Sequence, residues 1–184
     1  MNLANKLTVF RVVLVPFFVI SILADSDPTN RNELIALIIF IVATITDKLD
    51  GTVAKRQGTV TNFGKFMDPM ADKLLVCSAL VCLCAKGEIP AWVVLIIICR
   101  EFAISGVRQI AADNGVAIAA SKWGKAKTVA QMVMIIIMLV MRTFPSMHLG
   151  TLSAIVMYTA LILTVISLVD YIIKNIKVIT LGEM

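Results

Sequence analysis

Charged residues are scarce in this chain, and their scarcity excludes most classes of protein. Aspartate, glutamate, lysine and arginine make up 16% of the 184 residues, against roughly 25% in ordinary soluble domains. Hydrophobic residues make up 59%, and the mean hydropathy is +0.94. This composition excludes a soluble globular domain, a disordered chain and a secreted disulfide scaffold. It predicts a small polytopic membrane protein with a single domain over residues 1–184.

Clusters of histidine and cysteine are also missing, as are nucleic-acid motifs. The one histidine, His148, falls between two apolar segments and is expected at the surface. Of the four cysteines, Cys82 and Cys84 are two residues apart and point in different directions on a helix, which favours packing thiols over a metal site. No segment combines aromatic and basic residues as nucleic-acid-binding proteins do. We therefore attribute the net charge of +5 to membrane orientation and anionic lipid headgroups, with no nucleic-acid partner.

Six apolar segments are present, which predicts an all-α bundle of six transmembrane helices. The first and last segments are long enough to cross a membrane, whereas the middle four are shorter than the about 20 residues that a span needs. Each of the four must therefore extend into a flank that carries charged residues. The segments cover residues 7–23, 34–45, 74–85, 89–98, 129–141 and 149–169.

The basic residues are divided unevenly between the two ends of these spans. If the N-terminus is cytoplasmic, the outer loops hold only Arg31, Lys86 and Arg142, and most other lysines and arginines lie on the cytoplasmic side. The positive-inside rule favours this orientation. All four charged flanks then lie at the cytoplasmic ends of their helices, which predicts a polar cavity on the cytoplasmic side of the bundle.

Four aspartates are spaced to converge between two of the predicted helices. Asp47 and Asp50 are three residues apart, and Asp68 and Asp72 are four apart. Either spacing places both carboxylates of a pair on one helix face. A short connection between the helices would form an antiparallel hairpin and bring the two pairs together. Proline is preferred at the first position of a helix, so Pro69 indicates that Asp68 caps the second helix of this hairpin.

Four facing carboxylates require positive charge between them. Lys48, Lys73 and neighbouring arginines could supply it as a structural ion-pair network. The alternative is one or two divalent metal ions, and a ligand set made only of carboxylate oxygens favours magnesium, manganese or calcium over zinc. Gly51 follows directly after the first pair, where it serves either the close approach of a ligand to the backbone or the packing of helices.

The stretch from Asp47 to Asp72 carries a longer pattern, D-x2-D-G-x2-A-K-x8-G-x3-D-x3-D. This pattern resembles the signature of the CDP-alcohol phosphatidyltransferase family, with every spacing kept and with Lys55 where the family has arginine. Lysine keeps the positive charge but not the bidentate fork of arginine. The six-span architecture also agrees, so the resemblance covers nearly the whole chain.

The resemblance implies a reaction and a set of site residues. The family transfers the phosphatidyl group of CDP-diacylglycerol to an alcohol and releases CMP, by direct attack without a covalent enzyme intermediate. The aspartates Asp47, Asp50, Asp68 and Asp72 would hold two divalent cations, Mg²⁺ or Mn²⁺. Asp72 would also be the general base for the acceptor hydroxyl. CDP-diacylglycerol would contact Gly51, Ala54, Lys55 and Gly64.

The acceptor alcohol is predicted from basic residues at the cytoplasmic ends of the fourth and fifth spans. Arg108, Lys125 and Lys127 suit a doubly charged phosphate, although positive-inside residues on a solvated surface account for them equally well. Lys125 and Lys127 cannot share one helix face, so we expect a loop or a helix terminus there. The segments CREFAISGVR, GKAKT and LTVFR resemble the bacterial branch of the family that makes phosphatidylglycerophosphate from glycerol 3-phosphate. Arg11, in the last of these segments, is a further candidate for binding the acceptor phosphate.

Other functions stay open at this point. A cardiolipin synthase of the same fold would use phosphatidylglycerol as acceptor, a cation transporter would bind its ion with the intramembrane carboxylates, and a structural membrane subunit is the third alternative. Arg100 and Glu101, inside the fourth span, are either functional or part of a buried ion pair, such as Lys73 with Glu101. The resemblance also implies a homodimer, multi-pass in the cell membrane, with an active site that faces the cytoplasm.

Overall fold

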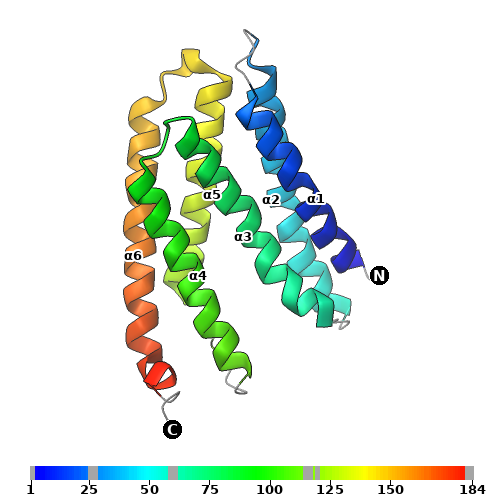
Figure 1. Cartoon of the computed structure of the whole chain (residues 1–184), viewed down its shortest axis with the longest axis vertical. Helices are drawn as coiled ribbons and strands as arrows, with labels where there is room; N and C mark the ends of the chain where they lie inside the picture. The colour runs from blue at the N-terminus through cyan, green and yellow to red at the C-terminus, as the bar shows by residue number, and fades with distance from the viewer. Residues whose placement is uncertain (1–2, 25–28, 58–61, 114–117, 119–120, 181–184) are drawn as a thin grey trace. The chain divides into compact units, whose positions relative to one another are not determined.

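The computed structural model describes the backbone of residues 3–24, 29–57, 62–113, 118 and 121–180, and the side chains of residues 9–24, 29–46, 73–112, 118 and 121–175. Every regular element in this part of the chain is helical, which confirms the all-α fold (Figure 1). The elements are α1 (Leu3–Leu23), α2 (Arg31–Gln57), α3 (Asn62–Ala85), α4 (Ala91–Asp113), α5 (Lys122–Thr143), the 3₁₀ helix η1 (Pro145–Met147) and α6 (Gly150–Thr180).

The helices are longer than the apolar segments that predicted them. α2 continues beyond Ile45 to Gln57, and α3 begins at Asn62, well before its apolar run at Leu74. α4 and α5 likewise include the charged sequences that follow and precede their apolar runs. The prediction that charged flanks complete the middle four helices is therefore confirmed. With 21 to 31 residues each, the described α-helices reach the length of a membrane span.

The described helices expose many large apolar side chains. Two of them, Lys122–Thr143 and Gly150–Asn175, are both long and apolar enough to cross a membrane, yet only 33% and 28% of their apolar windows are buried. Large apolar side chains on other helices are exposed as well, with Ile20 at 67% and Leu95 at 64%. Surface of this kind fits helices surrounded by lipid. The described helices are consistent with a membrane protein, and the count of six spans stays a prediction.

The chain divides into two compact units, of which the first consists of Met1–Glu88 and Ile135–Gly150. In this unit α1 packs against both α2 and α3 (Figure 1). Phe18 of α1 and Phe40 of α2 are fully buried, with their ring centroids 5.9 Å apart, and Leu80 of α3 is fully buried as well. Both helices that carry the aspartate pattern therefore pack against α1.

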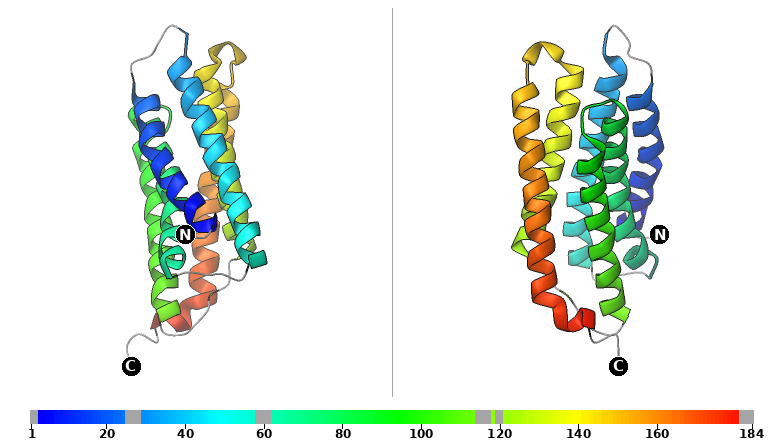
Figure 2. Two further views of the ribbon diagram at one scale, coloured as in Figure 1. Left: turned by 90° about the vertical axis from the view of Figure 1, so that its right-hand side faces the viewer. Right: turned by 60° about the vertical axis from the view of Figure 1, so that its left-hand side comes forward.

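The second unit consists of Ile89–Met134 and Thr151–Met184, so the boundary between the units falls within α5 and at the start of α6. α6 lies beside α4 and the first part of α5 (Figure 2). Two polar contacts cross the apolar interior of this unit. Gln131 Nε2 donates to Thr164 Oγ1 at 3.1 Å, and Arg100 Nη2 donates to Ser167 Oγ at 2.5 Å. These contacts tie α6 to both of its neighbours.

The fold also tests the prediction for the one histidine. His148 is exposed after η1, where its φ of 49° is in the left-handed region, and its Nδ1 lies 2.7 Å from the Ser146 carbonyl oxygen. The surface position predicted for this histidine is thus confirmed. The four cysteines are free, and no potential metal site among the described residues includes them.

Candidate active site

The aspartate pattern lies on two consecutive helices of the first unit. Asp47 and Asp50 are in the C-terminal part of α2, and Asp68 and Asp72 are in the N-terminal part of α3. Because both pairs are helical, their spacings of three and four residues do place each pair on one helix face. The side chains of these four aspartates, and the predicted substrate-binding positions Gly51, Ala54, Lys55 and Gly64, lie outside the residues whose side chains are described.

Asp68 does not cap α3, and that prediction is wrong. α3 begins at Asn62, so Asp68 and Pro69 lie inside the helix. A proline there removes one backbone donor from the helix, a loss that membrane helices tolerate because neighbouring groups satisfy the freed carbonyl. Asp68 and Asp72 therefore lie on one continuous helix.

The chemistry of the donor set decides whether divalent metals fit this pattern. Four carboxylates and no thiolate or imidazole form a hard, all-oxygen set of the kind that Mg²⁺ and Mn²⁺ prefer. Elsewhere, among the described side chains, no group of three or more histidine, cysteine, aspartate or glutamate residues could hold a metal ion. The aspartates of α2 and α3 therefore fit the two divalent cations that the resemblance implies.

A second polar site lies in the interior of the second unit, between α4 and α5. Lys127 Nζ of α5 donates to Glu101 Oε1 of α4, with side-chain exposures of only 4% and 12%. Arg100 Nη1 approaches the same carboxylate oxygen at 3.4 Å. Arg100 Nη2 also donates a hydrogen bond to the hydroxyl of Ser167 on α6, and Ser167 is fully buried. Three helices therefore contribute to one charged network in apolar surroundings.

Arg108 belongs to the same network, two turns beyond Arg100 on α4. It acts electrostatically on both Arg100 and Tyr171 of α6, so the three side chains are neighbours. The Nε atoms of Arg100 and Arg108 are buried and have no hydrogen-bond partner within the described part of the chain. A buried donor without a partner costs about 1–3 kcal/mol. Each of these two Nε–H groups can donate a hydrogen bond to an oxygen of a bound anion.

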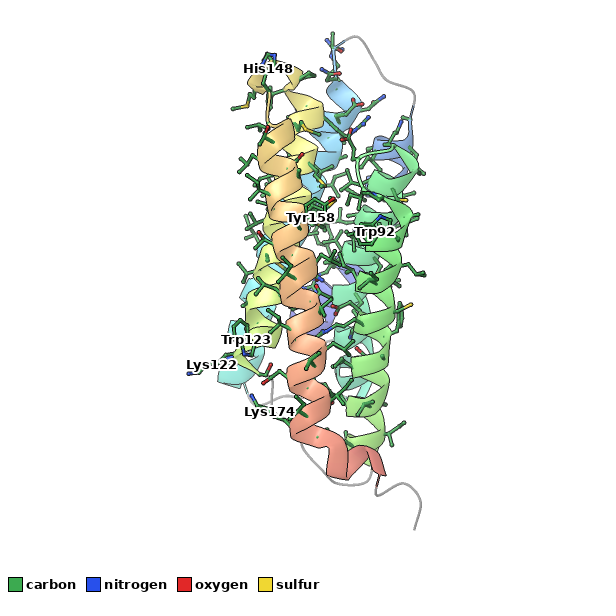
Figure 3. The ribbon with its side chains drawn as sticks, turned by 90° about the vertical axis from the view of Figure 1, so that its left-hand side faces the viewer. Trp92, Lys122, Trp123, His148, Tyr158 and Lys174 are labelled. Carbon is green, nitrogen blue, oxygen red and sulfur yellow. The ribbon has the colours of Figure 1, made fainter. Side chains whose placement is uncertain are left out.

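The described side chains of this network are mostly cationic. Arg100, Arg108 and Lys127 are cations, whereas Glu101 is an anion. The nearby Asp170 is engaged by Lys174, whose Nζ lies 2.6 Å from Asp170 Oδ1. Lys127 follows Lys122 and Trp123 by about one turn on α5, and Figure 3 shows these two residues and Lys174 toward the same end of the unit. Chemically, such a cluster can bind a dianion such as a phosphate monoester.

The residues predicted to bind the acceptor phosphate lie in different surroundings. Arg108 and Lys127 take part in the network. Lys125 is exposed on another face of α5, where it lines an apolar groove of about 480 Å³ with Val129 and Val156. Both lysines are in the first two turns of α5, which confirms the expected helix terminus. Arg11 is buried on α1 in the first unit.

Sequence reasoning missed two members of the network. Ser167 and Tyr171 carry no signal beyond being polar residues in a long apolar helix, and only the packing of α6 brings them to Arg100 and Arg108. Arg100 and Glu101 could be found from the sequence, because charged residues inside a span are candidates for function.

Comparison with known proteins agrees with the pattern on α2 and α3. The sequence model of the family described as CDP-alcohol phosphatidyltransferase matches residues 1–166. A protein of Bacillus subtilis named CDP-diacylglycerol–glycerol-3-phosphate 3-phosphatidyltransferase is 40% identical over 95% of this chain and 95% of its own. Proteins of the same name from Haemophilus influenzae and Rickettsia bellii are 39% and 34% identical, each over 92% of this chain and over 91% and 93% of their own lengths.

Proposed function

The chain belongs to the CDP-alcohol phosphatidyltransferase family, and we propose that it transfers the phosphatidyl group of CDP-diacylglycerol to glycerol 3-phosphate. The products are phosphatidylglycerophosphate and CMP. The observation that supports this acceptor is the network of Arg100, Arg108, Lys127 and Glu101, in which cations gather in the interior of the second unit. The names of the relatives support the same reaction.

The reaction is a direct displacement at phosphorus. The acceptor hydroxyl oxygen forms a bond to the phosphorus that carries the diacylglycerol, and the bond from this phosphorus to the oxygen of CMP breaks. The leaving CMP takes the bonding electrons, and Asp72 accepts the proton of the hydroxyl. When bound by Asp47, Asp50 and Asp68 with Asp72, the two divalent cations supply charge neutralisation for the pyrophosphate and the leaving group.

The residues between the aspartates are assigned to the nucleotide. Gly51, Ala54 and Gly64 have small or no side chains, which allows the backbone of α2 and α3 to approach a bound CDP moiety closely. Lys55 supplies a positive charge for the pyrophosphate in the place of the family's arginine.

The acceptor phosphate is assigned to the network of the second unit. A phosphate monoester carries close to two negative charges at neutral pH, whereas the phosphodiester of phosphatidylglycerol carries one. Arg108 and Lys127 would contact the phosphate oxygens, and the unpartnered Nε donors of Arg100 and Arg108 lie in the same network. A cluster of cations favours the dianion of glycerol 3-phosphate over the monoanion of phosphatidylglycerol. Lys125 and Arg11 stay predicted contributors to phosphate binding.

The setting of the reaction follows from the same proposal. We place the protein in the cell membrane as a multi-pass protein with six spans, its polar cavity and active site facing the cytoplasm, where glycerol 3-phosphate and CMP are soluble. The acyl chains of the substrate stay in the lipid. A homodimer is the assembly that the family resemblance implies.

An acceptor screen tests the proposal. The purified protein in mixed micelles with CDP-diacylglycerol and Mg²⁺ is given glycerol 3-phosphate, phosphatidylglycerol, serine, inositol phosphate or no acceptor, and released CMP is measured. We expect CMP release with glycerol 3-phosphate only. CMP release with phosphatidylglycerol and none with glycerol 3-phosphate would establish a cardiolipin synthase. If none of the acceptors leads to CMP release, the result would favour the transporter.

A further inference from the structure

Glu101 is an anion placed inside a site that is expected to bind an anion. We propose that Glu101 is a positioning residue, whose carboxylate holds Lys127 inside the contact between α4 and α5 and so fixes it for the acceptor phosphate. The inference rests on the proposed function, because it assigns Glu101 a task in the binding of glycerol 3-phosphate. Glu101 acts through Lys127 and does not touch the substrate.

The burial of Lys127 is the first observation behind this inference. Its side chain is only 4% exposed, although Lys127 lies near the N-terminal end of α5, from which a long lysine side chain can reach the aqueous boundary. A buried ammonium is strongly disfavoured unless an anion pairs with it. Glu101 Oε1 accepts the hydrogen bond from Lys127 Nζ, so this carboxylate draws the ammonium inward.

The contacts of Arg100 are the second observation. Arg100 Nη1 lies 3.4 Å from Glu101 Oε1, and Arg100 Nη2 donates to Ser167 on α6. The carboxylate is therefore shared by a cation of α4 and a cation of α5, and one of these is fixed to α6. This arrangement holds the cations in one geometry before any phosphate arrives, which lowers the entropy lost on binding.

The charge of Glu101 gives the third step of the argument. A carboxylate repels a phosphate, so contact between Glu101 and the acceptor would weaken binding. Its benefit must therefore come through its effects on Lys127 and on Arg100. A glutamine at this position would keep the shape of the side chain and lose both effects.

The test uses kinetics of the full-length protein in mixed micelles, with KM measured separately for glycerol 3-phosphate and for CDP-diacylglycerol. We expect Glu101→Gln to raise KM for glycerol 3-phosphate by about 10-fold or more, the scale of one lost charge-assisted hydrogen bond. KM for CDP-diacylglycerol should change less than about 2-fold, because the lost bond is not made to that substrate. The matched control is Glu88→Gln, the same change at a carboxylate that pairs with Arg142 in the first unit, and it should leave both KM values unchanged.

A double-mutant cycle separates a positioning role from the alternatives. If Glu101 acts through Lys127, the Glu101→Gln/Lys127→Met variant should have the same KM for glycerol 3-phosphate as Lys127→Met alone. The inference would be overturned if the double variant raised KM for glycerol 3-phosphate by the product of the two single effects. A rise in KM for both substrates together with a lower thermal stability would overturn it as well. Glu101→Asp keeps the charge, and a KM between those of the parent protein and Glu101→Gln is expected. This variant also carries the test if Glu101→Gln does not fold, and a parental KM in Glu101→Asp then counts against the inference.

The single variant Lys127→Met separates this inference from the proposed function. If Lys127→Met leaves KM for glycerol 3-phosphate unchanged, the assignment of the acceptor phosphate to this network fails. If Lys127→Met raises that KM and Glu101→Gln does not, only the positioning role of Glu101 fails.

Discussion

Arg142 at the end of α5 and Glu88 after the end of α3 form an ion pair in the first unit, with Arg142 Nη1 3.0 Å from Glu88 Oε1. The second guanidinium nitrogen, Nη2, lies 3.3 Å from Glu33 Oε1 in the first turn of α2. One guanidinium therefore joins α5 and α2 to the turn that follows α3, at the end of α2 opposite to Asp47 and Asp50. Glu33 is almost completely buried, so the arrangement depends on the positive charge of Arg142.

Arg142→Gln should destabilise the protein without affecting acceptor binding. Removing the guanidinium leaves the buried Glu33 without this cation, and we expect a loss of about 1–3 kcal/mol. The measurement is thermal inactivation in detergent together with KM for glycerol 3-phosphate. Glu88→Gln is the control, and its expected loss of stability is smaller because the Glu88 side chain is more exposed than that of Glu33. An Arg142→Gln protein as stable as the parent would show that the ion pairs of Arg142 contribute nothing to stability.

The fold was predictable from the sequence because membrane thickness sets the length of a span. The apolar run that ends at Ile45 is too short to cross a bilayer, so its helix had to continue through Asp47 and Asp50, as α2 does. The different faces of Lys125 and Lys127 followed from helix periodicity in the same way, and one is exposed while the other is buried. Local rules of length and periodicity account for these successes.

Two features of the site were beyond such rules. Pro69 indicated a helix start, but α3 begins at Asn62, because a proline inside a membrane helix does not always end it. The pairing of Glu101 with Lys127 joins residues 26 positions apart. It depends on how α4 and α5 pack, which no local pattern encodes. The partnership of Arg100 with Ser167 depends on the packing of α6 in the same way.

Arg108→Gln should weaken the use of glycerol 3-phosphate in particular. We expect kcat/KM for this acceptor to fall by about 10- to 100-fold, the scale of a hydrogen bond to a charged group. Arg108→Lys keeps the charge but loses the bidentate guanidinium, so its kcat/KM should lie between those of Arg108→Gln and the parent protein. Lys122→Gln is the control, since Lys122 is an exposed lysine on the first turn of α5. Equal losses in Arg108→Gln and Lys122→Gln would indicate a general effect of surface charge and would contradict phosphate binding by Arg108.

Asp72→Asn should abolish transfer. The amide cannot accept the proton of the acceptor hydroxyl, and loss of a general base costs about 10²- to 10⁴-fold in rate. The measurement is CMP release at saturating concentrations of both substrates, with thermal stability as the control for folding. If the variant keeps more than about a tenth of the parental rate, Asp72 is not the general base.

Removal of divalent cations should abolish activity reversibly. An excess of chelator is expected to stop CMP release, and Mg²⁺ or Mn²⁺ should restore it, because the aspartates of α2 and α3 form an all-oxygen ligand set. Zn²⁺ at the same free concentration should restore little activity, since no thiolate or imidazole belongs to this set. Full activity in chelator, or restoration by Zn²⁺ alone, would contradict metal binding by these carboxylates.

The orientation of α5 can be tested with single cysteines at its two ends. α5 has 22 residues, a length of about 33 Å at 1.5 Å per residue, so Lys122 and the exposed Ser146 after its C-terminal end should lie on opposite sides of the membrane. In a background without the four native cysteines, a membrane-impermeant maleimide should label Ser146→Cys in intact cells and Lys122→Cys only after permeabilisation. The reversed pattern would place the active site outside the cytoplasm, and labelling of both positions in intact cells would show that α5 does not span. Transfer activity of the cysteine-free background is the control that the labelled protein is folded.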